Sequence, residues 1–253
     1  MKKFLFLLAV AALAAGIYAA GVKKSDSSKG AADKPGAEEN VTPVPTPRIE
    51  AGKYKVVLDA GHGGFDPGKV SADNILEKDI NLAVVLKLSE YLKANGIEVV
   101  LTRENDAGLY SENDQNKKAA DLKKRVEIME NAKPDLIVSI HQNSYTDSSS
   151  RGAQVFYYKG SSQGCDFANL MQSTIKEIIG DGNHREAKDN TSYYLLKKTS
   201  TAIIIVECGF LSNPSEASLL ASEEYQEKIA GAVGEGIIRY LEREEHGDNN
   251  KED

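Results

Sequence analysis

Two histidines and two glutamates stand at positions where a folded chain could bring their side chains together. His62 and His141 each follow a short apolar run, and Glu207 follows a third run of the same kind. Such runs, bounded by small or polar residues, are typical of buried strands. If the three runs are parallel strands of one sheet, their last side chains meet at one edge, where open α/β sheets bind ligands.

Glu77, just downstream of the first run, completes a set that suits a zinc ion. Two imidazoles and one carboxylate can hold zinc while leaving a position for water, whose pKa zinc lowers toward neutrality. A further carboxylate can take the water's proton and return it to a leaving nitrogen. We therefore predict one zinc ion held by His62, Glu77 and His141, with Glu207 as the catalytic base. The residues are far apart in the sequence, which excludes a local finger-type site.

Other interpretations of these segments are weaker. Taken singly, a histidine at a strand end is more often structural than a ligand. The stretch from Gly63 to Lys69 nearly fits a phosphate-binding loop, but Val70 stands where Ser or Thr must bind Mg²⁺, and Asp66 would repel phosphate. Cys208 as a nucleophile is disfavoured because the adjacent glutamate would raise its thiol pKa. We expect Cys208 to be a small packing residue.

The folded part alternates strands with helices, which predicts a single α/β domain with a mostly parallel sheet and helices on both faces. Asn95-Gly96 supplies a stop for the first helix, and the long polar loop after Arg103 is expected to border the site. The remaining expected elements are strands at 56–60, 97–101, 135–140, 153–158, 193–196 and 202–206, and helices at 77–94, 118–131, 166–179 and 223–243.

The N-terminal region predicts export. Residues 1–20 combine a basic start with an apolar stretch, which favours a signal peptide or a membrane anchor. Residues 21–52 are rich in charged residues, Ser and Pro, which indicates a disordered linker. The catalytic domain is expected at 53–243 and a disordered charged tail at 244–253.

The composition limits the partners and covalent links of the chain. The formal net charge of −7 argues against a nucleic-acid partner. The two cysteines, Cys165 and Cys208, are too few for a disulfide scaffold, although in an exported protein they could pair.

Four ordered motifs, within the region from about Lys55 to Leu241, resemble those of the zinc-dependent N-acetylmuramoyl-L-alanine amidases. The resemblance implies a six-stranded α/β fold and cleavage of the amide between N-acetylmuramic acid and L-alanine of the peptidoglycan stem peptide. It gives the three predicted zinc ligands and the predicted base the same roles. The motifs are Leu58-Asp59-Ala60-Gly61-His62-Gly63-Gly64, Glu77-Lys78 with Asn81-Leu82, Ser139-Ile140-His141-Gln142-Asn143, and Val206-Glu207-Cys208-Gly209-Phe210-Leu211-Ser212-Asn213.

The segment Asn183–Asp189 further resembles the spore-cortex subgroup, whose members help to make muramic δ-lactam. Within it, His184 and Arg185 are candidates for substrate contact or for an ordinary polar loop; substrate-binding residues are otherwise unknown. The chain departs from the family where Thr199-Ser200-Thr201-Ala202 replaces a common Pro before the last strand. It shows no wall-binding repeat, so we expect localisation through the N-terminus or an accessory protein. A catalytically silent, zinc-structured wall-binding or scaffolding protein is the alternative, and the presence of Glu207 favours the enzyme.

Overall fold

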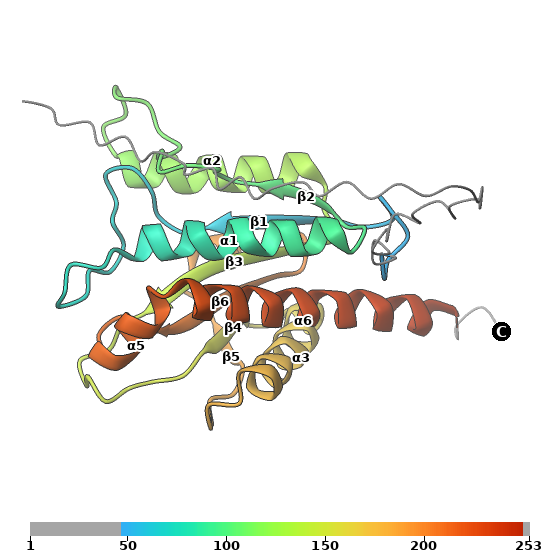
Figure 1. Cartoon of the computed structure of the whole chain (residues 1–253). Helices are drawn as coiled ribbons and strands as arrows, with labels where there is room; N and C mark the ends of the chain where they lie inside the picture. Colours follow the sequence, from blue (N-terminus) through green and yellow to red (C-terminus); the bar gives the residue numbers. More distant parts are fainter. Residues whose placement is uncertain (1–46, 250–253) are drawn as a thin grey trace, which may run out of the picture. The chain divides into compact units, whose positions relative to one another are not determined.

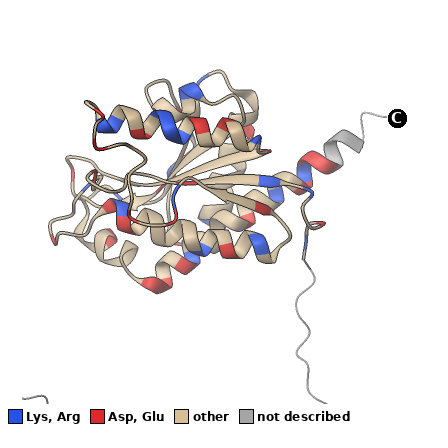
Figure 2. Ribbon diagram, turned by 90° about the horizontal axis from the view of Figure 1, so that it is seen from above, with Lys and Arg blue, Asp and Glu red and all other residues tan. Residues whose placement is uncertain are grey.

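The computed structural model describes residues 47–249, with side chains described as far as residue 245. The predicted signal segment, most of the predicted linker and residues 250–253 lie outside this range. No helix within 47–249 is long and apolar enough to cross a membrane. The described region contains a six-stranded sheet with helices on both faces, as predicted (Figures 1 and 2).

The strands lie in the order β2-β1-β3-β6-β4-β5. β1 pairs in parallel with β2 and β3, β3 pairs in parallel with β6, and β4 runs antiparallel to β6 and parallel to β5. The carboxyl ends of β1, β3 and β6 therefore meet at one edge of the sheet. The strands are β1 (Lys55–Ala60), β2 (Glu98–Leu101), β3 (Leu136–Asn143), β4 (Gln154–Tyr158), β5 (Lys188–Asn190) and β6 (Ile203–Phe210).

Two layers of helices cover the sheet because the central strands are apolar on both faces. On one face, α1, α3 and α6 pack over a core that includes Leu58, Ile140 and Val206; on the other, α2 and α4 pack over Val57 and Ile205. Figure 1 shows α1 and α6 side by side across one face. The helices are α1 (Glu77–Ala94), α2 (Lys117–Ala132), α3 (Ser162–Ile179), α4 (Tyr194–Lys198), α5 (Pro214–Leu220) and α6 (Glu223–Asn249).

The charged side chains are spread over the helices. Figure 2 shows acidic and basic residues interspersed along the helices on both sides of the sheet, with no basic stripe on the face in view. Acidic residues outnumber basic ones in the chain, in line with its formal net charge of −7.

The fifth strand was predicted at the wrong residues. Residues 193–196 were expected to be extended, but Tyr194–Lys198 form α4, because the Asn190 side chain accepts hydrogen bonds from the amides of Ser192 and Tyr193 and turns the chain. The actual edge strand is β5, which was predicted as loop. Its polar sequence, Lys-Asp-Asn, carries no strand signal, yet it pairs with Phe156–Tyr158.

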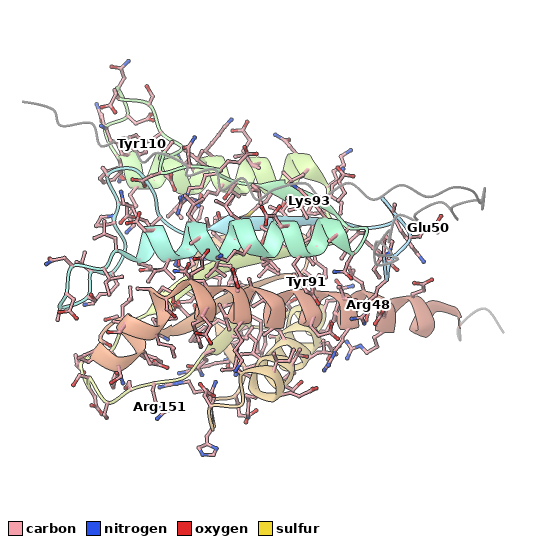
Figure 3. The ribbon with its side chains drawn as sticks, viewed as in Figure 1. Arg48, Glu50, Tyr91, Lys93, Tyr110 and Arg151 are labelled. Carbon is pink, nitrogen blue, oxygen red and sulfur yellow. The ribbon has the colours of Figure 1, made fainter. Side chains whose placement is uncertain are left out.

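The packed region is longer than predicted at both ends. Ile49 is buried in the core, before the predicted boundary at 53, and Arg48 forms ion pairs with Glu235 and Glu242 on α6 (Figure 3). At the other end α6 continues to Asn249, so residues 244–249 are helical rather than a frayed tail. An ion pair between Lys53 and Glu245 ties this last part of α6 to the domain.

Candidate metal centre

His62 lies on the loop that follows β1, in a backbone conformation that is unusual for a residue with a side chain. Its φ is 63°, in the left-handed region, which most non-glycine residues avoid. Its ring contacts two carboxylates: Nδ1 lies 3.1 Å from Oδ2 of Asp66, and Nε2 lies 3.2 Å from Oε1 of Glu77. The contact with Asp66 orients the ring so that Nε2 faces the second carboxylate.

Glu77 occupies the first turn of α1, as predicted, where the helix dipole favours a negative charge. Its side chain is buried and both carboxylate oxygens accept hydrogen bonds from the backbone. Oε2 accepts from the amide of Lys69 at 2.7 Å, and Oε1 accepts from the amide of Gln142 at 3.1 Å. These bonds fix the carboxylate at the end of the sheet.

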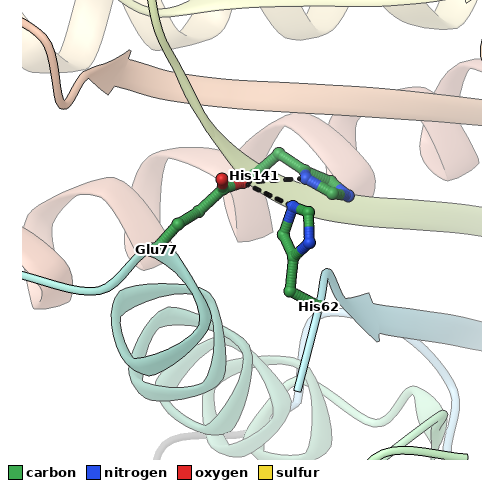
Figure 4. A group of neighbouring side chains, drawn as sticks. All are labelled: His62, Glu77 and His141. Atoms are coloured by element: carbon green, nitrogen blue, oxygen red, sulfur yellow. Dashed lines mark hydrogen bonds and ion pairs between the residues drawn. The ribbon is translucent and has the colours of Figure 1, made fainter. Parts of the chain in front are cut away.

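His141 lies on β3 and completes the group. Its Nδ1 is 2.9 Å from Oε1 of Glu77, and its ring packs edge-on against that of His62 with centroids 5.0 Å apart. One ligand atom from each of His62, Glu77 and His141 lies within 4.8 Å of the other two. Figure 4 shows both imidazoles turned toward the same carboxylate. The predicted three side chains thus converge, and their donor set fits a single metal ion.

Two glycines make room for this group. A Cβ on Gly61 would lie 2.3 Å from Cε1 and Nε2 of His141. At Gly68, where φ is 67°, a Cβ would lie 2.5 Å from Oε2 of Glu77 and 2.7 Å from Cδ2 of His62. The glycine-rich loop therefore allows the backbone to approach the three candidate ligands closely.

The electrostatics of the centre favour an ionised carboxylate. Burial acts to raise the pKa of Glu77, but the hydrogen bonds from His141 and His62 outweigh it and hold the pKa well below its usual range. Burial acts to lower the pKa of His141, and Glu77 reverses this effect and raises it. The three side chains form a mutually stabilised cluster.

Glu207 lies on β6 directly opposite His141 on β3. Its side chain is buried; Oε1 accepts a hydrogen bond from the hydroxyl of Tyr193 at 3.5 Å, and Oε2 has no hydrogen-bond partner among the described residues. Burial raises the pKa of Glu207 to about 7; Glu77 adds to this rise and His141 opposes it. A carboxyl group with this pKa can take up and release a proton near neutral pH.

The three candidate ligands and Glu207 share one open pocket of about 440 Å³. Ile205, Leu122 and Leu195 supply apolar lining, and Lys118 supplies an ammonium group. Tyr193, just before α4, and Tyr194, the first residue of α4, line the same pocket. The pocket thus combines an apolar surface with a cluster of polar groups, which is typical of a site for a small or extended organic ligand.

The structure argues against the two other interpretations, a phosphate-binding loop at Gly63 to Lys69 and a nucleophilic Cys208. No helix begins directly after the stretch from Gly63 to Lys69, since α1 starts at Glu77, so the loop lacks the helix N-terminus of a phosphate site. Cys208 is fully buried in the core, and burial raises the pKa of its thiol to about 12. Cys165 and Cys208 are both free, so they do not form a disulfide.

The loop after Arg103 borders the site, as predicted. Asp106 accepts hydrogen bonds from the amide of Gly64 and from Nζ of Lys78, and the hydroxyl of Tyr110 accepts one from the amide of Phe65. Figure 3 places Tyr110 next to the start of α2, at the end of the molecule where α1 also begins. By contrast, His184 and Arg185 line a separate pocket with Arg151.

The sequence pattern does not predict three residues of the site. Asp66 was considered only as an obstacle to phosphate, although its spacing of four residues from His62 could have suggested a contact. Tyr193 was placed in a strand. Arg103 begins the segment that the sequence predicts as a polar loop, and its burial depends on backbone carbonyls of other loops that the sequence does not place.

Comparison with known proteins agrees with this geometry. The family model described as N-acetylmuramoyl-L-alanine amidase matches residues 56–239, which include all four candidate site residues. The chain belongs to this family. A germination-specific N-acetylmuramoyl-L-alanine amidase of Bacillus subtilis is 37% identical over 189 residues, which cover 74% of this chain and 79% of that protein. The amidase AmiA of Escherichia coli is 29% identical and covers 78% and 79%.

Solved structures of amidases have the same fold. The CwlD amidase of Clostridioides difficile, solved in complex with the GerS lipoprotein, is 43% identical with a TM-score of 0.73 and covers 75% of this chain and 98% of that one. The catalytic domain of the amidase CwlV from Bacillus (Paenibacillus) polymyxa is 34% identical with a TM-score of 0.66 and covers 75% and 98%. The present amidase therefore has the α/β fold of the family.

Proposed function

We propose that this amidase is a zinc-dependent peptidoglycan hydrolase that cleaves the amide between the lactyl group of N-acetylmuramic acid and L-alanine of the stem peptide. The observation that carries the proposal is the convergence of His62, Glu77 and His141 beside Glu207 in one open pocket. Membership of the amidase family supports the assignment of this amide as the bond that is cleaved.

The donor set supports zinc as the cofactor. Two imidazoles and a carboxylate are a common set for catalytic zinc, which leaves a position for water or substrate. In this proposal Nε2 of His62, Nδ1 of His141 and Oε1 of Glu77 hold one zinc ion. When bound, zinc supplies Lewis acidity and lowers the pKa of a water molecule. The contact of Asp66 with Nδ1 of His62 would keep Nε2 of that ring free for the metal.

Glu207 is the proposed catalytic residue. Its Oε2, which lacks a partner among the described residues, would take a proton from the attacking water and pass it to the nitrogen of L-alanine as the C–N bond breaks. The hydroxyl of Tyr193 would keep Oε1 in place. A catalytically silent wall-binding protein has no need of such a buried, unpartnered carboxylate in an open pocket.

A role in the spore cortex is the finer proposal. It is supported by the likeness to the germination-specific amidase of Bacillus subtilis. The structure of CwlD in complex with a lipoprotein further supports an accessory protein as a partner of this amidase. We infer that residues 1–20 direct the chain out of the cytoplasm to the cell wall or the forespore intermembrane space, as a cleaved signal or as an anchor.

The test is release of new L-alanine amino termini from purified peptidoglycan by the full chain, with and without added zinc. We expect release that depends on zinc and falls by roughly 10²- to 10⁴-fold in Glu207→Gln, while that variant still binds one zinc ion. No release with the metal site shown to be full would favour the silent binding protein. No release with an empty site would point to a missing partner.

A further inference from the structure

Arg103 is a buried cation that donates hydrogen bonds to backbone carbonyls around the metal centre. It follows β2 and Thr102, and only 4% of it is exposed. Its Nε donates to the carbonyl of Ala60 at 2.8 Å, and its Nη1 donates to that of Asn105 at 3.0 Å. Its Nη2 donates to the carbonyls of Gly61 at 3.1 Å and Lys78 at 2.8 Å.

The two carbonyls that share Nη2 belong to the neighbours of two candidate ligands. Gly61 directly precedes His62, and Lys78 directly follows Glu77. One nitrogen atom therefore joins the loop after β1 to the first turn of α1. We propose that Arg103 is a positioning residue that fixes His62 relative to Glu77 and so forms the metal site before the metal binds. This inference rests on the proposed zinc site.

The neighbouring side chains support the same role. Every carbonyl from Ala60 to His62 accepts a hydrogen bond from a buried side chain: Arg125 donates Nη1 to that of Ala60 at 2.7 Å and Nη2 to that of His62. Asn81 donates Nδ2 to the carbonyl of Gly61 at 3.1 Å. Because His62 has a left-handed backbone, these bonds supply the restraint that an isolated loop would lack.

The geometry requires a guanidinium. The carbonyls of Ala60, Gly61 and Lys78 lie around one planar group, which presents its donors in a fixed fork. A lysine ammonium is a compact point charge on a flexible chain and cannot reach all three carbonyls in the same arrangement. Arg103→Lys therefore keeps the charge and removes the positioning.

The experiment compares the full chain with Arg103→Lys and Arg103→Met. The first readout is the Kd for zinc, measured by competition with a chromophoric chelator. The second is hydrogen exchange, in metal-free protein, of the amides of Gly63 and Asp66, which bond to each other's carbonyls. The control is Gln172→Leu, because Gln172 is also buried and also forms hydrogen bonds with the backbone. Its Nε2 donates to the carbonyl of Ala153, just before β4, and its Oε1 accepts from the amide of Val155 on β4.

We expect both Arg103 variants to weaken zinc binding roughly 10- to 100-fold and to speed exchange at Gly63 and Asp66. Gln172→Leu should lower the thermal midpoint and change neither readout. Zinc binding of wild-type strength in Arg103→Lys, or an equal loss in Gln172→Leu, would overturn the proposal. If Arg103→Met does not fold, Arg103→Lys decides. If the isolated wild type binds no zinc, exchange in the metal-free protein decides alone, and exchange of wild-type speed at Gly63 and Asp66 in Arg103→Lys would overturn the proposal.

Discussion

Gly61 separates the end of β1 from His62, and its lack of a side chain lets the backbone lie against the ring of His141. A Cβ at this position would overlap two ring atoms at 2.3 Å, so alanine must displace the imidazole. We expect Gly61→Ala to weaken zinc binding roughly 10- to 100-fold, the range seen when the surroundings of metal ligands are disturbed. Chelator competition on the purified variant measures the effect.

The matched control for Gly61→Ala is Gly231→Ala. Gly231 lies within α6, and a Cβ there would meet nothing within 4 Å. We expect this variant to bind zinc like the wild type and to gain up to about 1 kcal/mol in unfolding free energy, because alanine favours a helix. If Gly61→Ala bound zinc as tightly as Gly231→Ala, the ring of His141 would not be held as described.

Single residues of the site were predictable where their type already indicates chemistry. His62, His141 and Glu207 end apolar runs, so parallel strands alone bring them to one edge, and the structure does so. Arg103 and Tyr193 were not predictable in this way. Their partners are backbone carbonyls and a distant carboxylate, whose positions depend on how loops return to the sheet.

At the scale of the elements, the buried carboxylate of Asp59 on β1 connects β3, α2 and the residue that follows β2. Oδ1 accepts hydrogen bonds from Thr102, just after β2, and from Arg125 on α2, and Oδ2 accepts one from Ser139 on β3. Burial acts to raise the pKa of Asp59, but Arg125 and the two hydroxyls lower it to about 2. This network fixes α2 against the sheet beside the candidate metal centre.

The lowered pKa of Asp59 predicts that the unfolding free energy of the domain falls at low pH. Its value in the unfolded chain is roughly 3.9, so its contribution is complete above about pH 4 and is lost as the pH falls toward about 2. Asp59→Asn should cost roughly 1 to 3 kcal/mol at neutral pH, because it removes one of the two carboxylates that pair with the buried Arg125 and leaves Asp121 as the other. Its unfolding free energy, measured by urea titration, should change less than that of the wild type between pH 4 and 2.

The control for this pair is Asp73→Asn. Asp73 is exposed on the loop between β1 and α1. Its replacement should change neither the unfolding free energy at neutral pH nor the dependence of that free energy on acid. Equal acid profiles for the wild type and Asp59→Asn would show that other carboxylates, and not Asp59, govern stability in this range.

The helices and strands differ in how well the sequence predicts them. The long periodic helices and the three apolar strands were predicted at the right places, but α3 begins at Ser162 and not at 166, α6 continues to Asn249 and not to 243, and β6 continues to Phe210 and not to 206. The segment after Asn190 was not, because a short apolar run does not distinguish a strand from a turn of helix. α5 was also missed, although Asn213 caps it and Pro214 begins it, a pattern that the sequence already contains.

At the scale of the whole domain, the chain before β1 belongs to the folded unit. Ile49 is 4% exposed, and its amide donates to the carbonyl of Asn95 at the end of α1. Gly96 allows this approach, because a Cβ there would lie 2.2 Å from the carbonyl oxygen of Ile49. Composition alone assigned these residues to the linker, since one apolar side chain among polar neighbours gives no periodic signal.

The position of Ile49 predicts where the domain can be shortened. A chain that starts at residue 47 should keep the unfolding free energy of the domain, whereas one that starts at 53 should lose about 2 to 5 kcal/mol, the cost of emptying a buried isoleucine site. Ile49→Ala in the full chain should reproduce this loss in urea unfolding. Arg48→Ala should cost less than about 1 kcal/mol, because its ion pairs are partly exposed. If the chain from 53 and the chain from 47 unfolded alike, the domain would begin at β1, and the contact of Ile49 with α1 would contribute nothing to its stability.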